Sequence, residues 1–377
     1  MKLSTKRWIC SLMLVSMLLL CFAGCGKANS KDTWNIGATG PLTGSASSYG
    51  ISVKNGAELA IEEINKAGGL AGHDFKFDMK DDQAQPGPAG QGYDVLYEAG
   101  MIASIGSVTS DSCLAFGAKA AKDNLFFITP SASAQAVIET GTNAFRVCFG
   151  DPDQGTLAAQ QIKADGYTKV GCIYDTSDPY SAGIYEAFKA EMDKQGIAFN
   201  TQSFDKDNNK DFSSQVEQLK ECDIIFCPFY YTEAALVAQS CVSKSVNAVL
   251  FGCDGFDGIA GMFSDTDVIS NKILYITPFD VNSTEAKSAA FVSAYKAKYG
   301  SEPDQFAADG YDAIYLIYTA MKQADIKDLS LTASQVCELI KGVILQSSFS
   351  YAGVTGTMTW DASGACTKTP IIVEYKK

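Results

Sequence analysis

The sequence is poor in histidine: His73 is the only one among 377 residues. It also has no G-x-S-x-G motif, the sharp strand-to-helix turn that presents a nucleophilic serine. Nucleophilic sites of the Ser-His-Asp or Cys-His type need a histidine as base. His73 lies in the turn-like stretch Leu-Ala-Gly-His-Asp, which is typical of an exposed connector. We therefore expect the protein not to be an enzyme, and a hydrolase is the less favoured alternative.

Motifs that bind cofactors or metals are missing as well. Neither the G-x-G-x-x-G spacing of dinucleotide sites nor the G-x-x-x-x-G-K-[ST] pattern of phosphate loops occurs. Cys222 and Cys227 have no second matching pair for zinc, and residues 205–211 lack the central glycine and the later glutamate of a calcium loop. The sequence predicts no cofactor and no metal.

Basic residues are scarce relative to acidic ones: 30 Lys and Arg stand against 43 Asp and Glu, for a net charge of −13. Residues 1–24 hold three of the basic residues and none of the acidic ones, so the rest of the chain has 27 against 43, a net charge of −16. Binding to phosphate groups requires a basic face. We therefore expect no nucleic acid partner, and we interpret the acidity as a solubility feature.

Long apolar runs are also rare, and the only one that approaches a membrane span lies at residues 8–20. Three basic residues precede it and small residues lead from it to Cys25, which is the order of an export signal. The Ala-Gly-Cys ending resembles the lipobox of bacterial lipoproteins, although Phe22 replaces the usual leucine. We expect residues 1–24 to be a lipoprotein signal peptide, Cys25 to be lipidated and residues 25–32 to be a polar tether. An uncleaved signal anchor is the alternative, and both place the chain outside the cytoplasm on the bacterial cell membrane.

The twelve cysteines do not form an obvious disulfide framework. Three lie in the first 25 residues, and the remaining nine are an odd number in mostly apolar surroundings. Small buried thiols are the favoured interpretation, and pairing of some of them stays open.

Short strand-like runs alternate with longer stretches of helical period in the rest of the chain. The expected strands are residues 34–38, 75–79, 101–105, 126–129, 169–174, 197–203, 224–228 and 248–252, and the expected helices include residues 53–66, 153–165, 183–195 and 212–220. This alternation predicts an α/β fold with doubly wound parallel sheets. Because the pattern restarts near residues 150–155, and because more than 300 residues exceed one core, we expect two Rossmann-like lobes.

Ligands of such sheets bind beyond the carboxyl ends of the strands, so the loops that follow the strands are the candidate sites. Several of these loops, with their neighbours, resemble in colinear order the leucine/isoleucine/valine-type solute-binding proteins of ABC importers, which have the type I periplasmic-binding-protein fold. The segments that carry the resemblance are Ile-Gly-Ala-Thr-Gly-Pro-Leu-Thr-Gly at 36–44, Tyr-Gly at 49–50, Asn-Gly-Ala-Glu-Leu-Ala at 55–60, Ile-Asn-Lys-Ala-Gly-Gly at 64–69, Asp-Asp at 81–82, Ile-Gly at 105–106, Ile-Thr-Pro-Ser at 128–131, Gly-Cys-Asp-Gly at 252–255 and Thr-Met-Thr-Trp-Asp-Ala-Ser-Gly at 357–364.

The resemblance implies two lobes joined by a three-segment hinge, with the ligand in the cleft between them. The N-terminal lobe would comprise residues 33–150 plus 279–354, and the C-terminal lobe residues 151–278 plus 355–377. The chain would cross between the lobes near 151–155, near 277–278 and near 353–356. Hinge closure would then signal to a transporter that the protein is loaded.

The resemblance also implies a set of polar ligand contacts. Ser110 and Ser133, with backbone amides that include Ala132, would hold the ligand carboxylate, and the Ser131 carbonyl would accept from the ammonium. Asp254 falls where the best-studied members have glutamate as the counter-charge of the ammonium. A buried zwitterion does need donors for its carboxylate and an anion for its ammonium. Turn or capping hydrogen bonds are the alternative roles of the two serines, and an Asx turn that of Asp254.

Aromatic residues would line the cleft, namely Tyr49, Tyr180, Tyr230 and Phe306, for which a place in the core is the alternative. The resemblance thus implies a lipid-anchored, monomeric binding protein that captures a branched-chain or other apolar amino acid and delivers it to the permease of an ABC transporter. Short amides as ligands, a sensor that works with a separate membrane receptor and an exported hydrolase stay open as alternatives.

Overall fold

The computed structural model describes residues 32–375. The expected signal peptide, and Cys25 with its expected lipidation, lie outside the described residues. Thr33–Lys377 forms one compact unit. Within the described part of the chain, no helix is long and apolar enough to cross a membrane.

The first sheet contains five parallel strands in the order β2-β1-β3-β4-β5. Its strands are β1 (Thr33–Gly40), β2 (Asp74–Asp81), β3 (Ala103–Ser104), β4 (Phe127–Thr129) and β5 (Ala144–Arg146). The helices that connect them are α2 (Ser47–Lys66), α3 (Pro86–Glu98), α4 (Ser110–Asp123) and α5 (Gln135–Ile138). Most of β1 is buried, as expected for a strand with helices on both faces of its sheet.

The second sheet has six strands in the order β14-β10-β9-β8-β6-β7. Its strands are β6 (Val170–Asp175), β7 (Phe199–Phe204), β8 (Ile224–Cys227), β9 (Val249–Gly252), β10 (Ile273–Thr277) and β14 (Ile371–Tyr375), of which only β14 is antiparallel to its neighbour. Its connecting helices are α6 (Asp151–Ala164), α7 (Pro179–Gln195), α8 (Ser213–Gln218) and α9 (Tyr231–Lys244), followed by the short 3-10 helices η1 (Asp254–Phe256) and η2 (Ile259–Met262). Two parallel-stranded sheets with intervening helices confirm the predicted α/β class.

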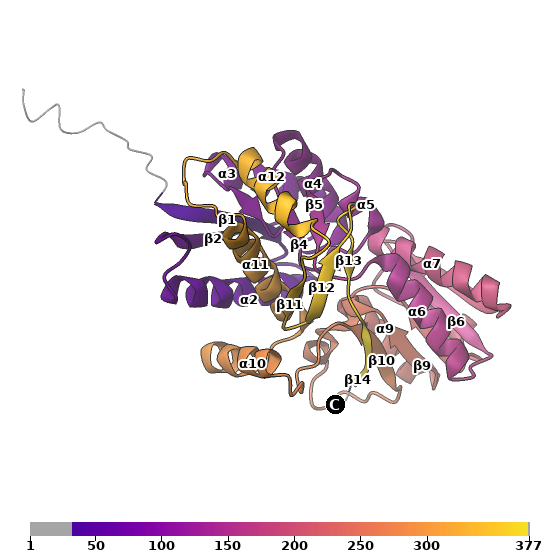
Figure 1. Cartoon of the computed structure of the whole chain (residues 1–377). Helices are drawn as coiled ribbons and strands as arrows, with labels where there is room; N and C mark the ends of the chain where they lie inside the picture. The colour runs from indigo at the N-terminus through magenta and orange to yellow at the C-terminus, as the bar shows by residue number, and fades with distance from the viewer. Residues whose placement is uncertain (1–31, 376–377) are drawn as a thin grey trace, which may run out of the picture. The chain divides into compact units, whose positions relative to one another are not determined.

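The chain returns to the first sheet after β10. It forms α10 (Ala286–Tyr299), α11 (Gln305–Gln323) and α12 (Ala333–Ile344), and then a small antiparallel sheet of β11 (Tyr351–Gly353), β12 (Gly356–Trp360) and β13 (Cys366–Thr367). Helix α11 packs lengthwise on α2, and α12 contacts β3. Figure 1 shows β14 beside β10, whereas β12 and β13 lie toward β5.

The predicted lobe boundaries stay a prediction, but two hydrogen bonds bear on the last of them. The backbone N–H of Arg146 in β5 donates to the Gly364 carbonyl at 3.3 Å, and the indole N–H of Trp360 donates to the Arg146 carbonyl at 2.8 Å. Because the segment from β12 to β13 bonds to the first sheet, these contacts indicate a third crossing after β13 rather than near residues 353–356.

The cysteines after Cys25 are free and buried, which confirms their interpretation as small buried thiols. They are Cys113, Cys148, Cys172, Cys222, Cys227, Cys241, Cys253, Cys337 and Cys366. No group of three or more His, Cys, Asp or Glu side chains among residues 32–375 is placed to hold a metal ion.

Candidate ligand-binding site

The predicted site residues follow strand ends in both sheets. Gly106, with a φ of +67° that glycine adopts without strain, turns the chain after β3 toward Ser110 at the start of α4. Ser131 follows β4, Tyr230 precedes α9 after β8, and Asp254 opens η1 after β9. Since the carboxyl ends of parallel strands meet at one edge of each sheet, these side chains converge.

They surround one cavity with an empty volume of about 230 Å³. We call it the aromatic cavity; its walls are Tyr49, Val108, Thr109, Ser110, Ser131, Tyr180, Tyr230, Asp254, Gly255 and Phe306. Seven of the nine predicted ligand-binding residues therefore lie together, and the other two, Ala132 and Ser133, do not line it.

Asp254 is buried, and the side chains that donate hydrogen bonds to its carboxylate reach only one of the two oxygens. Its carboxylate Oδ1 accepts hydrogen bonds from the Tyr180 hydroxyl at 2.7 Å and from the Gln154 side-chain amide at 3.0 Å. The side-chain oxygen of Gln154 accepts from the backbone N–H of Asp254 at 3.0 Å, and the side-chain amide of Gln305 donates to the Asp254 backbone carbonyl at 2.6 Å. Both side-chain donors reach Oδ1, so Oδ2 is available to a ligand.

Burial raises the pKa of Asp254 to about 6, while the hydrogen bonds from Tyr180 and Gln154 work in the opposite direction. The pKa of a carboxyl group rises in this way when the group is removed from water and has no counter-charge nearby. A ligand ammonium at Oδ2 would supply the missing charge.

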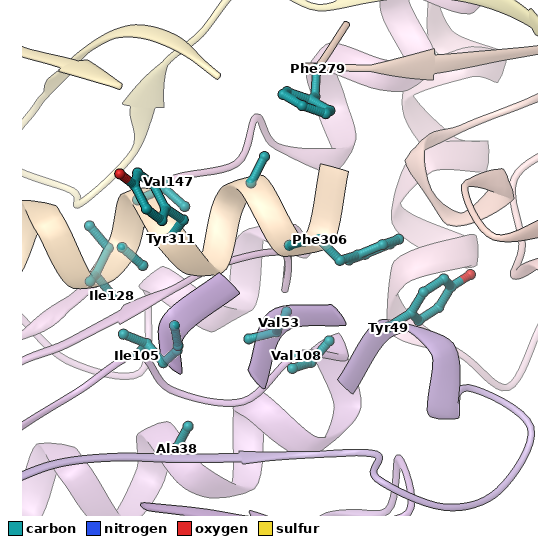
Figure 2. Close-up of a cluster of buried hydrophobic side chains, with 14 of the residues drawn as sticks. Ala38, Tyr49, Val53, Ile105, Val108, Ile128, Val147, Phe279, Phe306 and Tyr311 are labelled. Atoms are coloured by element: carbon teal, nitrogen blue, oxygen red, sulfur yellow. The ribbon is translucent and has the colours of Figure 1, made fainter. Parts of the chain in front are cut away.

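Aromatic rings make up most of the cavity wall. Tyr180 and Tyr230 stack with 5.0 Å between ring centroids, and Tyr49 lies against Phe306 at 4.1 Å. Figure 2 shows the rings of Tyr49 and Phe306 side by side at one end of the buried apolar cluster. The Tyr49 hydroxyl donates to the Gly255 carbonyl, so these rings are fixed by polar contacts as well as by packing.

The predicted serines have different surroundings. The Ser110 hydroxyl oxygen accepts from the backbone N–H of Ala134 at 3.2 Å, which leaves its own O–H free to donate. The Ser131 hydroxyl donates to the Val108 carbonyl at 2.7 Å. Ser110 is also the first residue of α4, where unpaired backbone N–H groups favour an anion.

Ala132 and Ser133 are fully buried behind this wall. The backbone N–H of Ala132 donates to the Thr129 hydroxyl at 3.0 Å, and the Ser133 carbonyl accepts from Arg146 at 2.9 Å. The Ser133 hydroxyl has no hydrogen-bond partner within normal geometry. Burial raises the pKa of the neighbouring Asp151, and Ser133 acts in the opposite direction. Ala132 and Ser133 could contact a ligand only if the ligand extended beyond the cavity wall or the wall residues moved.

Some site residues escaped sequence reasoning. Thr109 is 5% exposed and its hydroxyl oxygen has no hydrogen-bond partner, although it lines the cavity. Gln154 and Gln305 position Asp254 from 100 and 51 residues away along the chain. The position of Gln154 in the predicted crossing at 151–155 indicated it, because the chain segments that cross a hinge adjoin the cleft.

Two wound sheets whose strand ends meet at one cavity, with an anion, hydroxyls and aromatic rings in its wall, define a two-lobed solute-binding fold. The chain belongs to the periplasmic binding protein family, because the sequence model of this family matches residues 33–371. Membership implies an extracytoplasmic location. The predicted resemblance to the leucine/isoleucine/valine-type proteins is confirmed.

Several relatives extend over most of the chain. The Leu/Ile/Val-binding protein BraC3 of Rhizobium johnstonii is 28% identical over 292 residues, which are 77% of this chain and 79% of that protein. The leucine-, isoleucine-, valine-, threonine- and alanine-binding protein of Pseudomonas aeruginosa is 26% identical over 97% of this chain and 94% of its own length. The solved structure of the branched-chain amino acid transporter substrate binding protein LivJ from Streptococcus pneumoniae, in complex with isoleucine, matches with a TM-score of 0.80 and 26% identity, over 90% of this chain and 95% of that one.

Proposed function

We propose that this protein captures a free amino acid in the aromatic cavity and delivers it to the permease of an ABC transporter. The observation that carries the proposal is Asp254, a buried carboxylate with one oxygen held by Tyr180 and Gln154 and the other without a side-chain donor among the described residues. A fixed anion of this kind is what the ammonium of a zwitterion needs on leaving water.

The carboxylate of a zwitterion would contact Ser110 and the start of α4. Ser110 offers a free O–H, and the unpaired N–H groups at the start of α4 favour a carboxylate. Tyr49, Tyr230 and Phe306 would cover the ligand with apolar surface, which excludes water and strengthens both polar contacts.

The relatives support an amino acid as the ligand and an ABC transporter as the partner, because their names include leucine, isoleucine and valine and a branched-chain amino acid transporter. A lipid anchor at Cys25 would hold the protein beside the permease, and the chain would act as a monomer whose lobes close on the ligand. Unlike an enzyme, it would release its ligand unchanged.

A thermal-shift panel on the chain from Gly26, refolded to remove any carried ligand, tests the proposal. Each of the twenty amino acids, and a set of small amides and sugars, is added in excess. A ligand at a hundred times its dissociation constant stabilises the folded state by about 2.7 kcal/mol, which gives a clear shift. A response to at least one amino acid is expected, whereas a response to an amide or sugar alone would overturn the assignment of Asp254 to the ammonium.

A further inference from the structure

A second and larger cavity adjoins the aromatic cavity, with an empty volume of about 650 Å³ against about 230 Å³. We call it the acidic cavity. The two share Thr109 and Tyr230 in their walls, so a side chain that leaves the aromatic cavity past these residues enters the acidic one.

Carboxylates dominate the charge of the acidic cavity. Asp111 of α4, Asp175 at the end of β6, Asp178 at the start of α7 and Glu233 of α9 line it, against one basic residue, the exposed Lys206. Burial raises the pKa of Asp178 to about 7, and the charges of Asp175 and Asp111 act in the same direction. The carboxylates therefore repel one another in the closed protein, and a cation between them would relieve the repulsion.

Helix capping explains part of this arrangement but not all of it. Asp178 accepts from the backbone N–H of Tyr180 at 3.3 Å, and Asp175 accepts from Ser177 at 2.8 Å, so both have local structural roles. Asp111 has no hydrogen bond to a backbone group of the described chain, and Glu233 accepts from the Asn209 side chain at 2.9 Å. Capping also does not account for convergence on one cavity from four different elements.

An unpartnered polar group points independently to a ligand. The Thr109 side chain is 95% removed from solvent, lies in the wall of both cavities, and its hydroxyl oxygen has no hydrogen-bond partner. A buried hydroxyl without a partner costs about 1–3 kcal/mol. A polar ligand atom that passes from one cavity to the other would satisfy it.

The apolar part of the same wall fits the methylene stem of a long basic side chain. Phe204, Phe229 and Tyr230 line the acidic cavity beside the carboxylates. Lysine and arginine bury their methylene groups on such rings while the charged end reaches polar surroundings.

We propose that the acidic cavity receives the cationic side chain of the bound amino acid, so that this protein binds basic amino acids such as lysine, ornithine and arginine more tightly than uncharged ones of the same length. The inference rests on the proposed function, because the aromatic cavity must hold the ammonium and carboxylate common to all amino acids.

Matched ligands test it on the refolded chain from Gly26 by calorimetric titration. Lysine is compared with norleucine, which has the same four side-chain carbons but no terminal ammonium, and arginine with citrulline, which has the same length but no charge. We expect lysine and arginine to bind at least about tenfold more tightly than their uncharged partners. Raising NaCl from about 0.05 to about 0.5 M should reduce this preference, because salt screens the attraction to the carboxylates.

Variants connect the preference to the cavity. Asp111→Asn and Asp178→Asn should each reduce the ratio of norleucine to lysine dissociation constants at least about threefold, and asparagine at 178 preserves the helix cap. Glu98→Gln, at the exposed end of α3, should leave the ratio unchanged. The melting temperature of each variant shows that it is folded, and the salt titration of the unaltered protein is independent of any variant.

The outcomes separate the two proposals. Norleucine binding as tightly as lysine or more tightly would overturn the basic-side-chain inference and leave the amino acid receptor intact. Binding of no amino acid at all would overturn both. A lysine preference that both Asn variants retain in full would also contradict the role of the acidic cavity.

Discussion

At the scale of single residues, Ser110 and Asp254 face the aromatic cavity with unused hydrogen-bonding capacity. The Ser110 oxygen already accepts from Ala134, and only its O–H remains. The Asp254 Oδ1 accepts twice, and only its Oδ2 remains. One residue therefore offers a donor and the other an acceptor, which is the polarity that the two ends of an amino acid require.

Replacing Ser110 by alanine should weaken amino acid binding by about 1–3 kcal/mol, because a carboxylate would lose a hydrogen bond inside a closed cavity. The dissociation constant from calorimetric titration measures this. Ser112→Ala is the matched control on the same helix, since the Ser112 hydroxyl is buried, has no hydrogen-bond partner and does not line the cavity. Equal dissociation constants for the Ser110 variant and the unaltered protein would remove Ser110 from the site.

Sequence reasoning at this scale identified residues that follow strands but not the residues that hold them. Asp254 and Tyr230 could be predicted, because strand ends and a family resemblance both indicate them. The unpartnered hydroxyl of Thr109 and the clamp of Gln154 on Asp254 depend on contacts between distant segments. No local pattern encodes such contacts.

At the scale of elements, the close approach of α2 and α11 brings the Tyr49 and Phe306 rings together. Gly56 makes this approach possible, since a Cβ at this position would overlap the backbone carbonyl of Ala307. Gly56→Ala should lower the free energy of unfolding by about 1–3 kcal/mol, as overpacking does. Urea unfolding followed by circular dichroism measures the change.

Gly342 gives the matched control for this substitution. It lies exposed in α12, with nothing within 4 Å of an added Cβ. Gly342→Ala should raise the free energy of unfolding by about 0.5–1 kcal/mol, because alanine is the better helix former. If both variants were stabilised, the helices would not be in the close contact described.

A buried ion pair joins the end of the chain to α11. The Lys368 ammonium lies 2.6 Å from the Asp309 carboxylate, and the two side chains are 1% and 3% exposed. Lys368→Met should lower the free energy of unfolding by about 3–5 kcal/mol, because it leaves the Asp309 charge buried without a partner. Urea unfolding of the variant at neutral pH gives the value.

The exposed pair of Lys298 and Glu62 provides the comparison, since its nitrogen and oxygen are 2.7 Å apart but the side chains are 32% and 42% exposed. Lys298→Met should change stability little, because solvent screens the pair. A Lys368 variant as stable as the Lys298 variant would show that the buried pair contributes no stabilisation.

Helices and strands could be predicted in the part of the chain where strands and helices alternate. The expected strand at residues 34–38 is part of β1, and the expected helix at residues 183–195 is part of α7. The alternation ends after β9, the chain crosses to the first sheet after β10, and β14 pairs antiparallel with β10. Helix α11 and the small sheet of β11 to β13 were not predicted, because a crossing chain no longer repeats the βαβ pattern.

At the scale of the whole molecule, buried carboxylates make stability depend on pH. Burial raises the pKa of Asp254 to about 6, and burial together with the charge of Asp304 raises the pKa of Asp257 to about 7. These groups hold protons more tightly in the folded than in the unfolded state, where an Asp titrates near 3.9. Stability therefore falls as pH rises between the unfolded and folded pKa values, and the loss is complete above the folded ones.

The ligand-free protein should accordingly melt at a higher temperature at pH 5.5 than at pH 8. Differential scanning calorimetry across this range measures the trend. A saturating amino acid should reduce it, because the ligand ammonium stabilises ionised Asp254. A melting temperature that rises steadily from pH 5.5 to pH 8 would mean that the cleft carboxylates are hydrated in the free protein.

The central claim is that Asp254 is the counter-charge of the ligand ammonium. Calorimetric titration of Asp254→Asn against the best-binding amino acid and against its analogue without the ammonium tests it most directly, because asparagine keeps the shape and removes only the charge. We expect the variant to lose about 2–5 kcal/mol of binding free energy for the amino acid, which is the usual loss when one partner of a buried charge pair is removed. Its affinity for the analogue should not change. An amino acid dissociation constant that the substitution leaves unchanged would contradict the claim.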